Sequence, residues 1–157
     1  MSKADVTVDA KQVQDMFAEL EPRRRKQVFR AALNTSSNIL IRETRKNLAG
    51  VVKDPNSPNS WDGKKLQAGI KKRIARDAKS VKVHLLGDFR LKFFEMGTTE
   101  RYTKRHTKAR GGKGGYRGKN TGQYFFRSAK QSTERRIFED IDSTLQRHII
   151  RINKKYK

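Results

Sequence analysis

Cysteine is absent from the 157-residue sequence, tryptophan occurs once, proline three times and acidic residues only 16 times. Without cysteine the chain forms neither a disulfide framework nor a thiolate metal site, which excludes the disulfide-stapled small secreted domains and indicates synthesis inside the cell. The sequence also lacks the run of about 18 apolar residues that a membrane span needs, and its N-terminus contains no apolar signal-peptide core. We therefore expect a soluble protein without a membrane partner.

Basic residues are what the chain has in excess. The 38 Lys and Arg outnumber the 16 acidic residues and give a formal charge of +22, which predicts attraction to nucleic acid, to an acidic protein surface or to an anionic membrane without choosing among them. Hydrophobic residues make up 34% of the sequence, which is low for a globular protein and predicts a thin core. The length fits a single domain over residues 1–157.

The N-terminal part predicts two helices within residues 9–49. Residues 9–20 have apolar side chains at helical spacing behind a candidate N-cap, Asp9. A second helix is expected from Pro22, which suits a first helical turn, to Ala49, with Gly50 as its C-cap. Its apolar stripe is narrow and rich in small residues, so another element could approach it closely. The Pro- and Asn-rich residues 51–65 predict a loop.

Alternating patterns predict strands in residues 66–98. The segment 66–75 is expected to be extended, and apolar residues alternate with polar ones in KSVKVHLL and in FRLKFFEM. Gly87 and Asp88 between these two segments have turn chemistry, which predicts an antiparallel hairpin over residues 80–96. A further short strand is expected at the start of residues 123–153.

The clearest predicted element is a C-terminal helix from Ser128 to Asn153, opened by a capping box of Ser128 and Gln131. We expect an α+β fold in which this helix and the N-terminal helices pack on an antiparallel sheet of three to four strands. The predicted contact joins two apolar sets: Ile137, Ile141, Leu145 and Ile149 of the helix, and Val81, Val83, Leu91 and Phe93 of the sheet.

A basic, glycine-rich segment, residues 99–122, lies between the predicted strands and the last helix. It has eight basic residues and one acidic residue (Glu100), with five glycines between positions 111 and 118, which predicts a long mobile loop. We expect its cations to contact a partner protein or DNA; they are Arg101, Lys104, Arg105, Lys108, Arg110, Lys113, Arg117 and Lys119.

Catalysis is not expected. His84, His106 and His148 have no companion at metal-ligand spacing, and the sequence contains no Ser-His-Asp signature, Walker loop or HExxH motif. Glu95 and Asp88 are two acids near one predicted strand, which is too few for a nuclease metal site. No catalytic residue, metal or cofactor is therefore predicted.

Three short motifs resemble one known family. A Gly-x-x-Leu-x-x-Gly-Ile segment precedes a predicted hairpin that ends in Glu-x-Gly-Thr, and a Phe-Phe-x-x-Ala stretch opens the last helix. The matching residues are Gly63, Leu66, Gly69 and Ile70, then Glu95, Gly97 and Thr98, and then Phe125, Phe126 and Ala129. Over about residues 20–152 the chain resembles the tail-completion or head-tail joining proteins of long-tailed bacteriophages, often labelled minor tail components. Tyr124 replaces the usual proline, and the basic segment is longer than in the family.

The resemblance implies a virion structural protein, made in the host cytoplasm, that forms a homo-oligomeric ring, for instance a hexamer, among neighbouring phage connector and tail proteins. Glu95, Gly97 and Thr98 are then expected to shape the backbone, because glycine allows a chain reversal and a carboxylate accepts hydrogen bonds from amides. The alternative is a sequence-nonspecific nucleic-acid-binding protein, in which the basic segment follows phosphates while Tyr102 and Tyr116 stack on bases. A nuclease or toxin is a more distant third reading.

Overall fold

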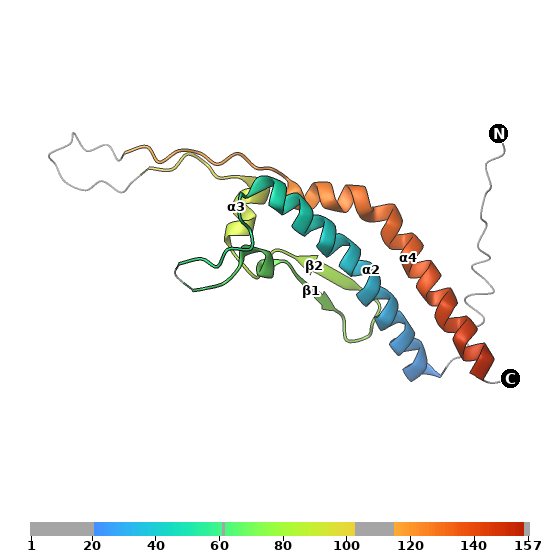
Figure 1. Cartoon of the computed structure of the whole chain (residues 1–157). Helices are drawn as coiled ribbons and strands as arrows, with labels where there is room; N and C mark the ends of the chain where they lie inside the picture. The colour runs from blue at the N-terminus through green and yellow to red at the C-terminus, as the bar shows by residue number, and fades with distance from the viewer. Residues whose placement is uncertain (1–20, 61, 103–114, 156–157) are drawn as a thin grey trace, which may run out of the picture.

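Two long helices form the body of the protein. The computed structural model describes residues 21–60, 62–102 and 115–155, with side chains described as far as residue 151. Helix α2 (Pro22–Val51) and helix α4 (Phe125–Lys155) run side by side in opposite directions (Figure 1). A two-stranded hairpin packs on α2, and a short 3₁₀ turn, η1 (Leu66–Gly69), and a short helix, α3 (Arg90–Met96), complete the fold. The architecture is α+β, as predicted.

Helix α2 confirms the predicted second helix and corrects its end. Pro22 occupies the first turn, where its missing N–H is not needed. The helix continues through Gly50, which was predicted to be the C-cap, and ends at Val51. The following residue, Val52, is extended and donates its N–H to the Leu48 carbonyl at 2.9 Å. The predicted helix at 9–20, with its Asp9 cap, lies outside the described residues.

Helix α4 packs along α2, and the predicted packing of this helix on the sheet is wrong. Ile137, Ile141 and Leu145 are only half-buried, whereas the fully buried positions of α4 before Ile149 include Ala129, Thr133 and Thr144. Helix α2 likewise buries small side chains; these are Ala32, Ser36, Ser37 and Thr44. Small side chains allow two helices to approach closely, which is why α4 pairs with the small-residue stripe of α2 rather than with the sheet.

The buried hydroxyl groups of this seam are hydrogen-bonded within their own helices. Thr133 Oγ1 donates to the Ala129 carbonyl at 2.7 Å, and Thr44 Oγ1 donates to the Leu40 carbonyl at 2.7 Å. A hydroxyl that bonds to the carbonyl four residues earlier needs no partner on the other helix. The two helices therefore pack closely, and their buried hydroxyl groups need no hydrogen bond from the facing helix.

We expect Ala129→Leu to lower the free energy of unfolding by about 1 to 2 kcal/mol, because added methylenes in a packed seam force side chains and backbone apart. Ala129 is 0% exposed, while the adjacent Ser128 is exposed on the same helix, so Ser128→Leu is the matched control. Urea denaturation of both variants measures the difference. Equal effects at the two positions would contradict the packing of α4 on α2.

The sheet consists of β1 (Lys71–Ile74) and β2 (Val81–His84), which pair antiparallel with Lys71 opposite His84. Their turn lies at residues 75–80, so the hairpin predicted over residues 80–96 is wrong, although the chain does turn at Leu86 and Gly87. Lys72 links the hairpin to α2 by two hydrogen bonds. Its Nζ donates to the Asn34 carbonyl at 2.9 Å and to Asn38 Oδ1 at 2.6 Å. Two strands are described where three to four were predicted.

The segment FRLKFFEM, predicted to be a strand, forms helix α3. Asp88 precedes it and accepts a hydrogen bond from the Arg90 N–H at 3.0 Å, and Gly97 ends it with a φ of 79°. Leu91 is buried and Phe94 is half-buried, a helical spacing of three, whereas Phe93 is exposed. The two ends of the segment thus favour a helix that the alternating pattern did not indicate. The predicted strand near residue 123 is also wrong, because α4 begins at Phe125.

The apolar core lies where α2 ends and α4 begins. One cluster of buried side chains joins both helices, η1 and α3; it consists of Ile41, Leu48, Leu66, Ile70, Leu91 and Phe125. The core therefore lies beside the point where residues 97–102 leave the body and residues 115–122 return to it.

Candidate interface: a basic ribbon at the start of helix α4

The chain leaves the body after α3 and returns before α4 as a paired, extended ribbon. We call residues 97–102 and 115–122 the basic ribbon. The Thr98 N–H donates to the Asn120 carbonyl at 2.8 Å, and Arg117 N–H donates to the Arg101 carbonyl at 2.7 Å. Isolated bridges join Gly97 to Thr121 and Tyr102 to Tyr116. The ribbon projects away from the helices (Figure 1). In the described residues the predicted long loop therefore has two paired arms, and its mobility stays a prediction.

Three of the eight predicted contact residues lie on the basic ribbon: Arg101, Arg117 and Lys119, all exposed. The other five lie outside the described residues; they are Lys104, Arg105, Lys108, Arg110 and Lys113. The three described cations come from both arms of the ribbon, so the ribbon pairing brings together charges that are 16 to 18 positions apart in sequence. A polyanion passing across the ribbon would meet both arms.

An aromatic pair joins the two arms near the described tip of the basic ribbon. The Tyr102 and Tyr116 ring centroids are 5.4 Å apart with a tilt of 57°, and the two residues are 60% and 58% exposed. Tyr102 Oη donates to Glu100 Oε2 at 2.9 Å, which orients that ring. The pair supports the ribbon through contact between the rings and still leaves more than half of each tyrosine accessible to a partner.

A small pocket of about 290 Å³ lies at the base of the ribbon. Its cationic lining consists of Arg90 from α3 and Arg101 and Lys119 from the two arms. Arg90 is held by Asp88, since its Nε donates to Asp88 Oδ1 at 3.0 Å. This hydrogen bond lowers the pKa of the Asp88 carboxyl below its usual range and raises the pKa of Arg90. The pocket has the chemistry to receive a phosphate or carboxylate group.

Glu95 connects the root of the ribbon to α4. Its carboxylate accepts hydrogen bonds from the backbone N–H groups of Phe126 at 2.8 Å and Arg127 at 3.0 Å. Its backbone carbonyl accepts a third, from the Tyr124 N–H, at 3.1 Å. The first N–H groups of a helix have no partner within the helix, and a carboxylate there also interacts favourably with the helix dipole. Glu95 therefore caps α4 from 30 residues away, and the predicted capping box of Ser128 and Gln131 is wrong because Ser128 lies inside the helix.

Gly97 and Gly122 let the two arms approach each other at the root. The φ of Gly97 is 79°, which confirms the expected positive φ, although Gly97 ends helix α3 and not a strand. A Cβ on Gly97 would lie 2.5 Å from the Asn120 carbonyl oxygen and 2.6 Å from the Gly122 nitrogen. Thr98 Oγ1 accepts a hydrogen bond from the Asn120 N–H at 3.0 Å. Glu95, Gly97 and Thr98 thus shape the backbone, as expected.

The first motif contributes to the same region. Leu66 and Ile70 are 5% and 3% exposed in the core cluster that also contains Phe125. Gly69 accepts the N–H of Gly87 at 3.1 Å and has no room for a side chain, because a Cβ would lie 2.5 Å from the Asp88 Cβ. Gly63 lies instead in the exposed loop, with a φ of 66°. Nearly all the motif residues thus meet around the base of the ribbon.

Asn120 and Tyr124 also shape this site, and the sequence reasoning missed both. Asn120 Nδ2 donates to the Phe93 carbonyl at 3.2 Å, and Tyr124 has a positive φ of 49° immediately before α4. Asparagine ahead of Thr-Gly is a turn signal, but nothing near Asn120 in the sequence indicates that its partners are Phe93 and Thr98.

Within the described residues, no group of three or more His, Asp or Glu side chains is placed to hold a metal ion. His84 Nδ1 accepts the Leu86 N–H at 3.3 Å, His148 is half-buried on α4, and His106 lies outside the described residues. None of the helices in the described parts of the chain is long and apolar enough to cross a membrane.

Comparisons of the chain with protein-family models, with curated proteins and with solved structures returned no match.

Proposed function

We propose that this chain is a structural protein of a bacteriophage or prophage, that it forms a homo-oligomeric ring in the head-tail connector or tail-completion region of the virion, and that it is not an enzyme. The observation that supports this proposal is the convergence of the motifs. Residues from three separated segments meet in one core and one helix cap, around Leu66, Glu95 and Phe125. That construction holds a basic ribbon out from a rigid body, which suits contact with another component better than chemistry in a cleft.

In a ring, symmetry repeats the basic ribbon once per subunit and produces a positive collar. Such a collar has two suitable partners: the end of the packaged DNA, or an acidic surface on a neighbouring connector or tail protein. The pocket formed by Arg90, Arg101 and Lys119 fits either partner, since a phosphate and a carboxylate offer similar oxygen geometry.

The second candidate is a sequence-nonspecific nucleic-acid-binding protein. The observation that favours it is the exposed pair Tyr102 and Tyr116 between Arg101 and Arg117, because aromatic rings among cations bind single strands without reading their sequence. Sedimentation velocity with and without DNA, at low and high salt, separates the two candidates. A ring-forming protein associates without DNA, whereas a binding protein of the second kind changes its sedimentation only when DNA is present.

Neutralising the described ribbon cations tests which partner the ribbon contacts. If the partner is DNA, we expect Arg101→Gln/Arg117→Gln/Lys119→Gln to flatten the log-log dependence of DNA affinity on salt by about 0.9 for each phosphate that the variant no longer neutralises. The melting temperature should stay nearly unchanged, since these side chains are exposed. Fluorescence titrations over a range of salt concentrations measure the slope.

The matched control removes the same charge elsewhere. Arg30 is exposed on α2, and Arg76 and Lys79 are exposed on the turn between β1 and β2. The first half of α2 and the β1–β2 turn lie away from the ribbon (Figure 1). Substituting these three by Gln should leave the slope nearly as it is in the wild type. If the partner is a protein, the ribbon variant should fold and self-associate normally but fail to join heads to tails. A ribbon variant that binds DNA and joins heads to tails like the control would contradict both roles of the ribbon.

A further inference from the structure

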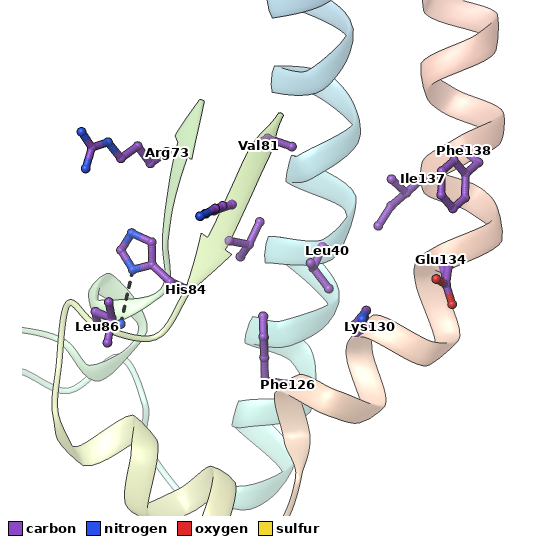
Figure 2. Close-up of a pocket in the computed structure, with 12 residues that line it drawn as sticks. Leu40, Arg73, Val81, His84, Leu86, Phe126, Lys130, Glu134, Ile137 and Phe138 are labelled. Carbon is purple, nitrogen blue, oxygen red and sulfur yellow. Dashed lines mark hydrogen bonds between the residues drawn. The ribbon is translucent and has the colours of Figure 1, made fainter. Parts of the chain in front are cut away.

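An apolar groove of about 690 Å³ runs between the hairpin and α4. Figure 2 shows Leu40 of α2 between its two walls. Val81 and Val83 of β2 contribute to one wall, and Phe126 and Ile137 of α4 contribute to the other. The groove is separate from the basic ribbon, and the proposed ribbon contacts do not use it.

Two large apolar side chains at the rim of this groove are open to solvent. Leu86 is 87% exposed and Phe138 is 65% exposed. A hollow with apolar walls and such a rim resembles a binding groove for an amphipathic helix more than an ordinary polar surface. The charged residues around it are three cations, Arg73, Lys82 and Lys130, and one anion, Glu134. An acidic, apolar segment would therefore complement the groove.

The sequence contains one such segment, which lies outside the described residues. Residues 9–20, which we call the arm, carry Val13, Met16, Phe17 and Leu20 at helical spacing together with three acidic residues and one lysine. The first 21 residues hold five of the 16 acidic residues of the chain and only two of its 38 basic residues. The arm thus has the opposite charge to the rest of the protein.

The length of the groove also agrees with the length that the arm would have as a helix. The groove follows one face of α4 from Phe126 to Phe138, a span of about 18 Å at the helical rise of 1.5 Å per residue. As a helix, the 12 residues of the arm would be about 18 Å long. We propose that the apolar groove of one subunit binds the arm of a neighbouring copy of the chain, with its apolar stripe against Phe138 and its acids near Arg73, Lys82 and Lys130. This inference rests on the proposed self-association of the chain and identifies the surfaces through which two subunits would contact each other.

A helical arm folded back along its own α2 would not reach the middle of the groove of the same chain. The arm ends next to Glu21, where α2 begins, and Leu40 lies about 27 Å further along α2. An arm folded back along its own α2 would extend about 18 Å and would stop short of Leu40. An arm of a second copy has no such constraint. The resulting contact joins two different surfaces, head to tail, which closes a ring when the rotation between subunits allows it.

Two substitutions, one on each side of the contact, test the proposal in the full chain. We expect Phe17→Ser in the arm and Phe138→Ser in the groove each to raise the concentration needed for half-association at least tenfold in sedimentation velocity. The controls are Gln14→Ser, off the apolar stripe of the arm, and Ile150→Ser, since Ile150 is 55% exposed on α4 outside the groove. Both controls should associate like the wild type.

A mixture of the Phe17→Ser and Phe138→Ser chains tests the contact most directly. The Phe17→Ser chain keeps an intact groove, and the Phe138→Ser chain keeps an intact arm, so the mixture should form one-to-one pairs that cannot grow further. Association of all variants like the wild type would overturn the arm contact and leave ring formation standing. A wild type that stays monomeric at every concentration would overturn the self-association itself. Loss of stability in Phe17→Ser without loss of association would place the arm on its own chain and also overturn the proposal.

Discussion

Gly97→Val is expected to destabilise the protein by about 3 to 5 kcal/mol, because a β-branched residue resists a positive φ and its Cβ clashes with packed backbone. The φ of Gly97 is 79°, and the clash would be with the Asn120 carbonyl oxygen at 2.5 Å and the Gly122 nitrogen at 2.6 Å. Backbone atoms at a bridge between two arms cannot move aside as a flexible side chain can. The root of the basic ribbon should therefore open, and the cap of α4 with it.

Gly118→Val separates the strain of the positive φ from the clash. Gly118 lies on the same ribbon with a φ of 84°, but a Cβ there meets nothing within 4 Å. We expect this control to cost about 1 to 2 kcal/mol, the strain alone. Urea denaturation followed by circular dichroism measures both variants. Equal losses of stability at the two glycines would show that the root of the ribbon is not closely packed.

Glu95→Ala is expected to destabilise the protein by about 2 to 4 kcal/mol, because it removes the charged acceptor from two N–H groups at the start of α4. The carboxylate is half-buried and bonds to Phe126 and Arg127 at 2.8 and 3.0 Å. Glu95→Gln should cost less than Glu95→Ala, since the amide oxygen still accepts one hydrogen bond, and less than Gly97→Val. Thermal unfolding of the three variants gives this order.

Glu139→Ala is the matched control for Glu95. The Glu139 carboxylate also accepts a hydrogen bond on α4, from Arg135 Nε at 2.8 Å, but both of these side chains are exposed. A surface ion pair of this kind contributes about 0 to 1 kcal/mol, so the control should unfold nearly like the wild type. A Glu95→Gln chain that folds like the wild type while losing a catalytic activity would instead identify Glu95 as a catalytic residue.

The outcomes of both substitutions matter for the proposed function as well as for stability. Glu95 joins α3 to α4, and Gly97 joins the two arms, so together they set the direction in which the basic ribbon leaves the body. A chain that folds with a loosened root should keep its ribbon charges but present them in many directions. Defective joining of heads to tails by such a chain would show that the direction of the ribbon matters, beyond its charge.

The predictions that held rest on local patterns. Helix α2 follows from Pro22 at its start and a long stretch without a breaker, and α4 from a sustained helical period. The positive φ of Gly97 follows from a glycine at the end of a regular segment. The hydrogen-bonding role of Glu95 was predicted in kind, but the amides that it contacts lie in another segment of the chain.

The predictions that failed were those in which one short pattern allowed two structures. Phe89, Leu91 and Phe93 alternate like a strand, but three positions are too few to distinguish a strand from one helical turn. Asp88 and Gly97 decided for a helix through contacts at its two ends. The partner of α4 was predicted from the most apolar faces, whereas small residues on α2 allowed the closest approach and so determined the packing.

The sequence by itself determined the two long helices, the excess of positive charge and its concentration between Arg101 and Lys119, because helical period, helix breakers and charge are properties of neighbouring residues. Only the tertiary structure decided that α4 packs on α2, that α3 is a helix, and that Glu95 caps α4 across 30 residues. It also decided that the two arms of the ribbon pair at Gly97 and Thr121. The physical reason is that a hydrogen bond or a close contact between distant segments depends on where the rest of the chain places them, and leaves no periodic signal in either segment.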